Sequence, residues 1–169
     1  MITIVVAADL NGAIGANNRI PWRLRDDLVR LKELTLERAV ILGRKSYDSM
    51  VWYYDKSGRP MPGKEYVVLT RDAGYKPARD DARAAHSIEE AVDGARDEDV
   101  VVIGGGDIFK AALPFTDKVY LTEVQTKITD ADAYFPKLNE AEWMESSRTH
   151  HAKDDRNEFD YDFVTYDRR

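Results

Sequence analysis

The chain has 169 residues, a formal net charge of -6 and no cysteines. This length fits one domain over residues 1–169, and the interspersed charges disfavour non-specific binding to nucleic acid. The lack of cysteines excludes disulfides, thiolate-ligated metals and cysteine nucleophiles. No apolar run approaches the roughly 20 residues that span a membrane, and the N-terminus lacks the features of a secretory leader. We therefore expect a cytoplasmic protein without a membrane partner.

Strands and helices are predicted to alternate over the first two thirds of the chain. Continuous β-branched runs predict strands, covered on both faces, at residues 2–8, 39–42, 66–70 and 100–103. Leucines at 24, 28, 31 and 34 predict a one-faced helix between the first two strands. Shorter helices are predicted from 44 to about 50, from Ser87 with a capping box to Glu90, and over 107–113 before Pro114.

The pattern changes after Lys118, where strands follow one another without helices. Apolar residues mark a strand at 119–124, and alternation at 159–163 marks a later one that extends to 166. Its predicted partner is the segment 143–149. Alternation is typical of antiparallel strands with one wetter face. The order of elements therefore predicts an α/β fold with a mainly parallel sheet and an antiparallel C-terminal edge.

Two turns between a buried strand and a helix are candidate phosphate sites. Gly43-Arg44-Lys45-Ser46 combines the free N–H groups of a helix start with two cations and a hydroxyl. Taken alone, it could equally be a solvated helix start. Gly104-Gly105-Gly106 exceeds what a tight turn needs and lets a backbone approach a ligand closely. Two such turns in a small protein indicate a ligand with several phosphates, such as a dinucleotide.

Asp26 and Asp27 lie in the predicted first turn of the leucine helix, where acids commonly serve as helix-capping groups. Their expected orientations differ, however. Asp27 borders the apolar stripe and Asp26 should point more to solvent. A carboxyl group beside an apolar face is a candidate for a perturbed pKa and for proton transfer. The three histidines lack metal-ligand spacing, so no metal site is expected.

In combination these clusters resemble the dihydrofolate reductase family. The matching landmarks run in order along the chain: Ile14-Gly15, Pro21-Trp22 with Asp27, residues 43–46, Pro62-Gly63, residues 103–106 and Thr122. The resemblance implies reduction of 7,8-dihydrofolate with NADPH. It also implies an eight-stranded twisted sheet with about four flanking helices, in a monomer that binds antifolate inhibitors.

The resemblance implies roles for individual residues. Asp27 would promote protonation of the pterin N5, supported by Trp22 and Thr122. The implied substrate residues are Val5, Ala7, Leu28, Leu31, Met50, Met61, Lys64, Ile103 and Phe109. The implied cofactor residues are Ala8, Ile14, Gly15, Ile20, Gly43, Arg44, Lys45, Ser46, Leu69, Thr70, Arg71, Gly104, Gly105, Gly106, Asp107 and Ile108. Lys45 and Arg71 would favour the 2′-phosphate, and the peptide bond between Gly105 and Gly106 would be cis.

Three departures qualify the resemblance. Lys64 stands where the family has an arginine, and lysine cannot form a bidentate fork with the carboxylate of the substrate tail. Residues 51–57 look like an insertion, whose Trp52, Tyr53 and Tyr54 could cap the folate-tail end of the cleft or pack on the surface. Phe109 replaces a tyrosine that is frequent in the family.

Two other functions are compatible with such a fold. One is the related reductase that acts on pyrimidine intermediates of riboflavin synthesis, which would not require Pro21-Trp22 followed by Asp27. The other is a nucleotide-binding module that has lost catalysis.

Overall fold

The computed structural model describes residues 1–17, 19–94 and 98–169. Within these residues an eight-stranded sheet has the order β5-β4-β3-β6-β1-β7-β10-β9. Its strands are β1 (Ile2–Asp9), β3 (Ala39–Gly43), β4 (Glu65–Leu69), β5 (Ala82–Ala85), β6 (Val100–Val102), β7 (Lys118–Val124), β9 (Trp143–His151) and β10 (Tyr161–Arg168). The strands from β5 to β7 pair in parallel, and β10 joins β7 and β9 antiparallel. The predicted sheet is thus confirmed.

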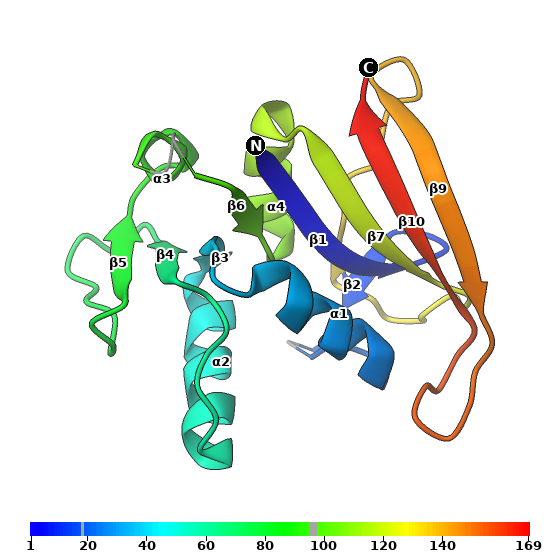
Figure 1. Cartoon of the computed structure of the whole chain (residues 1–169), viewed down its shortest axis with the longest axis horizontal. Helices are drawn as coiled ribbons and strands as arrows, with labels where there is room; N and C mark the ends of the chain where they lie inside the picture. Colours follow the sequence, from blue (N-terminus) through cyan, green and yellow to red (C-terminus); the bar gives the residue numbers. More distant parts are fainter. Residues whose placement is uncertain (18, 95–97) are drawn as a thin grey trace.

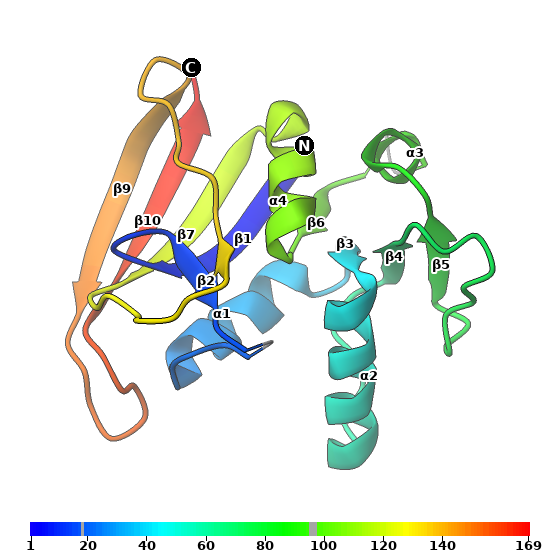
Figure 2. The same cartoon turned by 180° about the vertical axis from the view of Figure 1, so that it is seen from behind.

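Helices cover both faces of the sheet, which explains the continuous apolar runs (Figures 1 and 2). On one face, Ile4, Ile41 and Val102 pack with residues of α3 (Ile88–Asp93) and α4 (Gly106–Ala112). On the other, Val40 and Leu42 pack with α2 (Arg44–Ser57), and α1 (Arg25–Thr35) crosses β1. None of these helices has the length and apolar composition needed to cross a bilayer, as far as the described residues extend.

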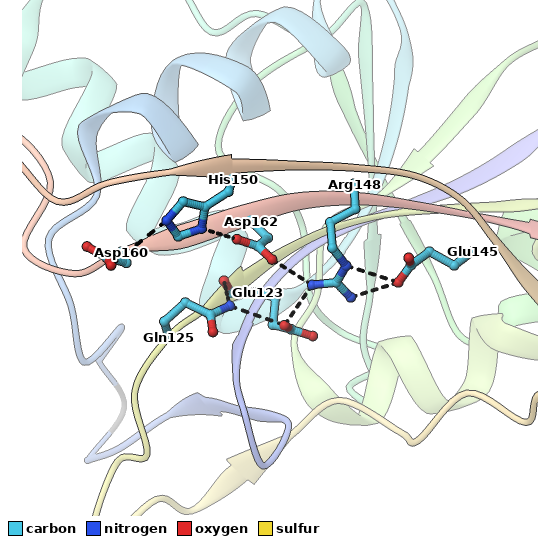
Figure 3. Close-up of polar contacts among 7 residues, drawn as sticks. All are labelled: Glu123, Gln125, Glu145, Arg148, His150, Asp160 and Asp162. Carbon is cyan, nitrogen blue, oxygen red and sulfur yellow. Dashed lines mark hydrogen bonds and ion pairs between the residues drawn. The ribbon is translucent and has the colours of Figure 1, made fainter.

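Charged side chains tie together the antiparallel edge of the sheet (Figure 3). Arg148 on β9 donates hydrogen bonds to Glu123 on β7, to Glu145, and to Asp162 on β10 at 2.7 Å. His150 lies 2.7 Å from the other oxygen of Asp162. Burial opposes ionisation of Asp162, but the hydrogen bonds from Arg148 and His150 keep its pKa below the usual value. This edge is held by ion pairs in place of a covering helix.

The largest local difference from the sequence prediction is the length of α2. The helix does not end near Met50 but continues to Ser57, so the apparent insertion is two further turns of helix. No glycine or proline interrupts residues 51–57, and Gly58 ends the helix with a left-handed φ of 69° and an N–H bonded to Tyr54. Gly58 is therefore the effective stop signal.

Smaller differences concern short or exposed strands. The strand β5 and the two-stranded sheet of β2 (Ala13–Gly15) and β8 (Ala133–Tyr134) were not predicted. The last strand begins at Tyr161, two residues later than the alternation indicated. The side chain of Ser87 accepts the predicted hydrogen bond from the Glu90 N–H, so that capping interaction is confirmed.

Candidate active site

An apolar cavity of about 190 Å³ opens beside the carboxyl ends of β3 and β6. This is the edge where ligands of parallel α/β sheets bind. Side chains from β1, α1 and α4 form most of the wall. The lining residues are Val5, Val6, Ala7, Ile14, Ile20, Asp27, Leu28, Leu31, Ser46, Ile103, Gly105 and Phe109. Of these, Val6 alone is absent from the predicted set; it also belongs to the core cluster that contains Ile4 and Phe109.

Leu28 shows why the leucine stripe of α1 has a role beyond packing. Its side chain is 55% exposed although it lies on the apolar face of the helix. Leu28 and Leu31 line the cavity, whereas Leu24 is buried just before the helix begins. Apolar side chains left open in a concave site are typical of a binding pocket for an apolar ring.

Asp27 is the single carboxylate among the residues that line this cavity. Thr122 of β7 donates a hydrogen bond to its Oδ1 at 2.7 Å. Burial raises the pKa of Asp27, while the Thr122 hydrogen bond and the nearby positive charge of Arg30 oppose the rise. The group is thus suited to hold a proton at a pH where an exposed aspartate would be ionised.

Asp26 was expected to point more to solvent than Asp27, but it is not a free surface group. Asp26 is half-buried and accepts a hydrogen bond from the hydroxyl of Tyr161 at 2.9 Å. Tyr161 comes from the last strand of the sheet, so this contact could not be inferred from the helix pattern. Asp26 faces the antiparallel edge of the sheet and Asp27 faces the cavity.

A loop near the C-terminus holds the start of α1. Leu24 precedes the helix without offering a side-chain cap. Asn157 supplies the missing group, since its Oδ1 accepts a hydrogen bond from the Asp26 N–H at 3.1 Å. The carbonyl of Arg156 accepts another from the Arg25 N–H at 3.3 Å. Asn157 is fully buried, and sequence reasoning missed it because its partners lie about 130 residues away.

Trp22 lies in the loop before α1, next to the cavity. It is 8% exposed and packs with Leu24, Val124 and Tyr161. Its Nε1 is buried without a hydrogen-bond partner among the described residues. A buried N–H without an acceptor is costly, so this N–H is a polar feature of the loop that the protein's own side chains do not satisfy.

The two glycine turns are adjacent in space. The Gly43 N–H donates to the Gly104 carbonyl at 2.8 Å. Neither α2 nor α4 has a side-chain cap at its N-terminus. A Cβ built on Gly105 would have no neighbour within 4 Å, so a ligand can reach that backbone. The predicted cis bond lies one residue earlier than expected, between Gly104 and Gly105.

The cationic residues predicted to bind the cofactor differ in the contacts that they make. Arg44 forms an ion pair with Asp72 at 3.3 Å and lies over the ring of Tyr75. Lys45 and Arg71 are exposed. The remaining predicted cofactor residues lie on nearby elements: Ala8 on β1, Ile14 and Gly15 on β2, Ile20 in the loop before α1, Leu69 and Thr70 at the end of β4, and Gly106, Asp107 and Ile108 at the start of α4.

Comparison with known proteins identifies the fold and its relatives. The sequence model of dihydrofolate reductase matches residues 1–168. The dihydrofolate reductase of Haemophilus influenzae is 36% identical over 99% of this chain and 98% of its own length. That of Staphylococcus haemolyticus is also 36% identical, over 99% of this chain and 95% of its own length.

The chain belongs to the dihydrofolate reductase family. A solved structure of the Enterococcus faecalis dihydrofolate reductase, complexed with NADP(H) and RAB-propyl, superimposes with a TM-score of 0.85 at 29% identity. The match covers 100% of this chain and 96% of the enterococcal one.

At the predicted substrate-tail end, Lys64 is bonded to other residues of the chain. The backbone N–H of Lys64 donates to the Arg38 carbonyl, while its Nζ forms an ion pair with Glu98 at 2.7 Å. Lys64 is not among the residues that line the 190 Å³ cavity. Met50 and Met61 are likewise outside it and pack in the core beneath α2.

The other two departures expected from the sequence, Phe109 and residues 51–57, have different surroundings. Phe109 is 3% exposed, lines the cavity and makes an edge contact with Phe135. On the last two turns of α2, Tyr54 packs against the core, whereas Trp52 and Tyr53 are 64% and 54% exposed. The structure leaves both exposed aromatic side chains available to a ligand or to solvent.

Proposed function

We propose that this protein reduces 7,8-dihydrofolate to tetrahydrofolate with NADPH as the hydride source. The observation that carries the proposal is Asp27, a buried carboxyl group on the wall of an apolar cavity, held by Thr122 at 2.7 Å. A flat pterin ring matches such a site, because it offers apolar faces and a polar edge. The named relatives support the same substrate.

The residues beside the cavity fit NADPH. The uncapped start of α2 offers free N–H groups to a phosphate, next to the exposed Lys45. The open space above Gly105 allows a ring or sugar to lie on the backbone. When bound, the nicotinamide supplies a hydride to C6 of the substrate. Arg44, Lys45, Ser46 and Arg71 would hold its phosphates.

Asp27 would manage the proton that accompanies the hydride. Burial keeps its carboxyl group protonated to a higher pH than in an exposed aspartate, so it can promote protonation of N5. Thr122 fixes one carboxyl oxygen, which leaves the other free to pair with the pterin. The apolar wall excludes bulk water from the reacting atoms.

A direct assay tests this function. Purified protein is mixed with NADPH and 7,8-dihydrofolate, and the loss of NADPH absorbance is followed. Turnover with dihydrofolate supports the proposal. Turnover only with the pyrimidine intermediates of riboflavin synthesis would establish the related reductase instead, and NADPH binding without either reaction would indicate a catalytically impaired binding protein.

Lys45→Ala is expected to raise the KM for NADPH by about tenfold or more, because a charge-assisted contact to the 2′-phosphate is lost. The KM for NADH, which lacks that phosphate, should change little. Steady-state kinetics with both cofactors measure the difference. Lys153→Ala, which removes an exposed lysine in the distant β9–β10 connection, is the matched control. An equal effect on NADH and NADPH would contradict the assignment.

Lys64→Arg is expected to lower the KM for dihydrofolate roughly several-fold, because arginine can grip the tail carboxylate with two parallel hydrogen bonds. Glu98 competes for the side chain at this position, since it pairs with Lys64 at 2.7 Å. Combining the change with Glu98→Gln should therefore strengthen the effect. An unchanged or higher KM in both variants would show that residue 64 does not reach the substrate.

A further inference from the structure

Arg30 occupies an unusual place for an arginine. It lies three residues after Asp27 on α1, so the two side chains share one face of the helix. Its guanidinium carbon is 4.2 Å from the ring centre of Phe163 on β10 and 5.2 Å from that of Tyr120 on β7. The Nη1 atom is buried and has no hydrogen-bond partner in the described part of the chain.

The strand register places this guanidinium beside the partner of the candidate acid. Thr122, which donates to Asp27, is directly opposite Phe163 in the β7–β10 pair. Tyr120 is two residues before Thr122 and therefore on the same face of β7. Arg30 thus stacks on the two aromatic side chains that flank Thr122.

Packing alone does not explain an arginine here. Stacking on aromatic rings favours the guanidinium, but a buried N–H without an acceptor is destabilising, and an apolar side chain would avoid that penalty. Burial lowers the pKa of Arg30, while the negative charge of Asp27 opposes that change. The feature that an uncharged side chain could not reproduce is the positive charge close to Asp27.

We propose that Arg30 is a positioning residue that acts through Asp27: its fixed positive charge limits the pH range over which the carboxyl group remains protonated. This inference rests on the proposed role of Asp27. Arg30 itself is not among the residues that line the cavity, so its effect on the substrate would pass through Asp27. Without its charge, the acid would hold its proton to a higher pH, because burial would act with less opposition.

The other charged and titratable groups around α1 are identifiable. Tyr161 on β10 donates to Asp26, and His151 on β9 stacks on the Tyr161 ring at 5.0 Å between centroids. Tyr120 faces Arg30 from β7. Glu123 and Asp162 belong to the ion-pair network and are next in sequence to Thr122 and Phe163. Their side chains therefore lie on the opposite face of the sheet (Figure 3). Lys118, two residues before Tyr120 on β7, places its Nζ 5.7 Å from the Tyr120 ring centre and pairs with Asp167 at 3.5 Å. Arg30 is the cation whose charge acts on Asp27.

The test compares variants that remove or keep the charge. Arg30→Met and Arg30→Gln remove it with different shapes, and Arg30→Lys keeps it. The titration of the Asp27 carboxyl carbon is followed by ¹³C NMR in the ligand-free protein and is assigned by its loss in Asp27→Asn. The midpoint should rise by about one pH unit in the two uncharged variants and by much less in Arg30→Lys. If one uncharged variant fails to fold, the other gives the answer.

Kinetics supply the second measurement. The pH profile of kcat should shift to higher pH in the same variants. A merely structural role would change the rate without moving the profile. Unchanged midpoints in the uncharged variants, or an equal shift in Arg30→Lys, would overturn the inference. The NMR titration needs neither cofactor nor substrate, so failure of the protein to reduce dihydrofolate would refute the proposed function separately.

Discussion

Replacing Asp27 by asparagine is expected to lower turnover at neutral pH by about a hundredfold or more, because the ionisable group that promotes protonation is lost. Asparagine has nearly the same shape, and its carbonyl oxygen can still accept the hydrogen bond from Thr122. The loss should shrink as the pH falls, because solvent then protonates the substrate directly. Rates of NADPH oxidation across the pH range measure both effects.

Asp26→Asn is the matched control for this variant. Asp26 lies on the same helical turn but bonds to Tyr161 and does not line the cavity, so its amide should support normal turnover. If Asp27→Asn retained the parent rate at neutral pH, proton delivery would have to come from another group.

Stability offers an independent readout of the same carboxyl group. The pKa of Asp27 is raised in the folded state, so between the unfolded and folded pKa values the native protein binds more protons than the unfolded chain. The contribution of this group to the free energy of unfolding therefore falls as the pH rises through that window. Asp27→Asn should consequently be more stable than the parent at neutral pH, with the difference vanishing in acid below both pKa values.

The largest expected loss of stability comes from Tyr66→Ala. Tyr66 is fully buried at the start of β4, and its hydroxyl oxygen accepts a hydrogen bond from the Gly63 N–H at 2.7 Å. Removing a buried aromatic ring leaves a cavity and should cost about 3–5 kcal/mol in the free energy of unfolding. The change is measured by urea denaturation, as a lower midpoint at constant slope.

Two variants separate the ring from the hydroxyl. Tyr66→Phe keeps the ring but leaves the Gly63 N–H without its acceptor, which should cost about 1–3 kcal/mol. Tyr53→Ala removes a tyrosine that is 54% exposed and should change stability by less than about 0.5 kcal/mol. Equal losses in Tyr66→Ala and Tyr53→Ala would show that the packing around Tyr66 contributes little.

The central strands were predictable because they are buried on both faces and therefore consist of continuous β-branched runs. The strand β5 escaped prediction because it lies at an edge of the sheet, and its sequence Ala82-Arg83-Ala84-Ala85 carries no β-branched residue. The length of α2 was underestimated because the predicted helix was ended near Met50, although no glycine or proline occurs between that residue and Gly58.

The candidate site likewise contains residues that local sequence patterns predict and contacts that they do not. Asp27, Leu28 and Leu31 follow from helix periodicity, and the glycine turns follow from their place after buried strands. The contacts of Asp26 with Tyr161 and of Arg30 with Phe163 join α1 to the last strand. Such contacts depend on the register between distant strands, which no local pattern contains. The pairing of Lys64 with Glu98 is hidden for the same reason.

The hydrogen bond from the Asp26 N–H to Asn157 has a consequence for biosynthesis. During translation the helix that carries the acid is made early, but the residue that holds its first turn is made more than 130 residues later. A ribosome-bound chain that ends before Asn157 can form much of the parallel sheet, yet it lacks the anchor that sets the direction of Asp27. The protein should therefore acquire the geometry of the Asp27 site only after the connection between β9 and β10 has left the ribosomal tunnel.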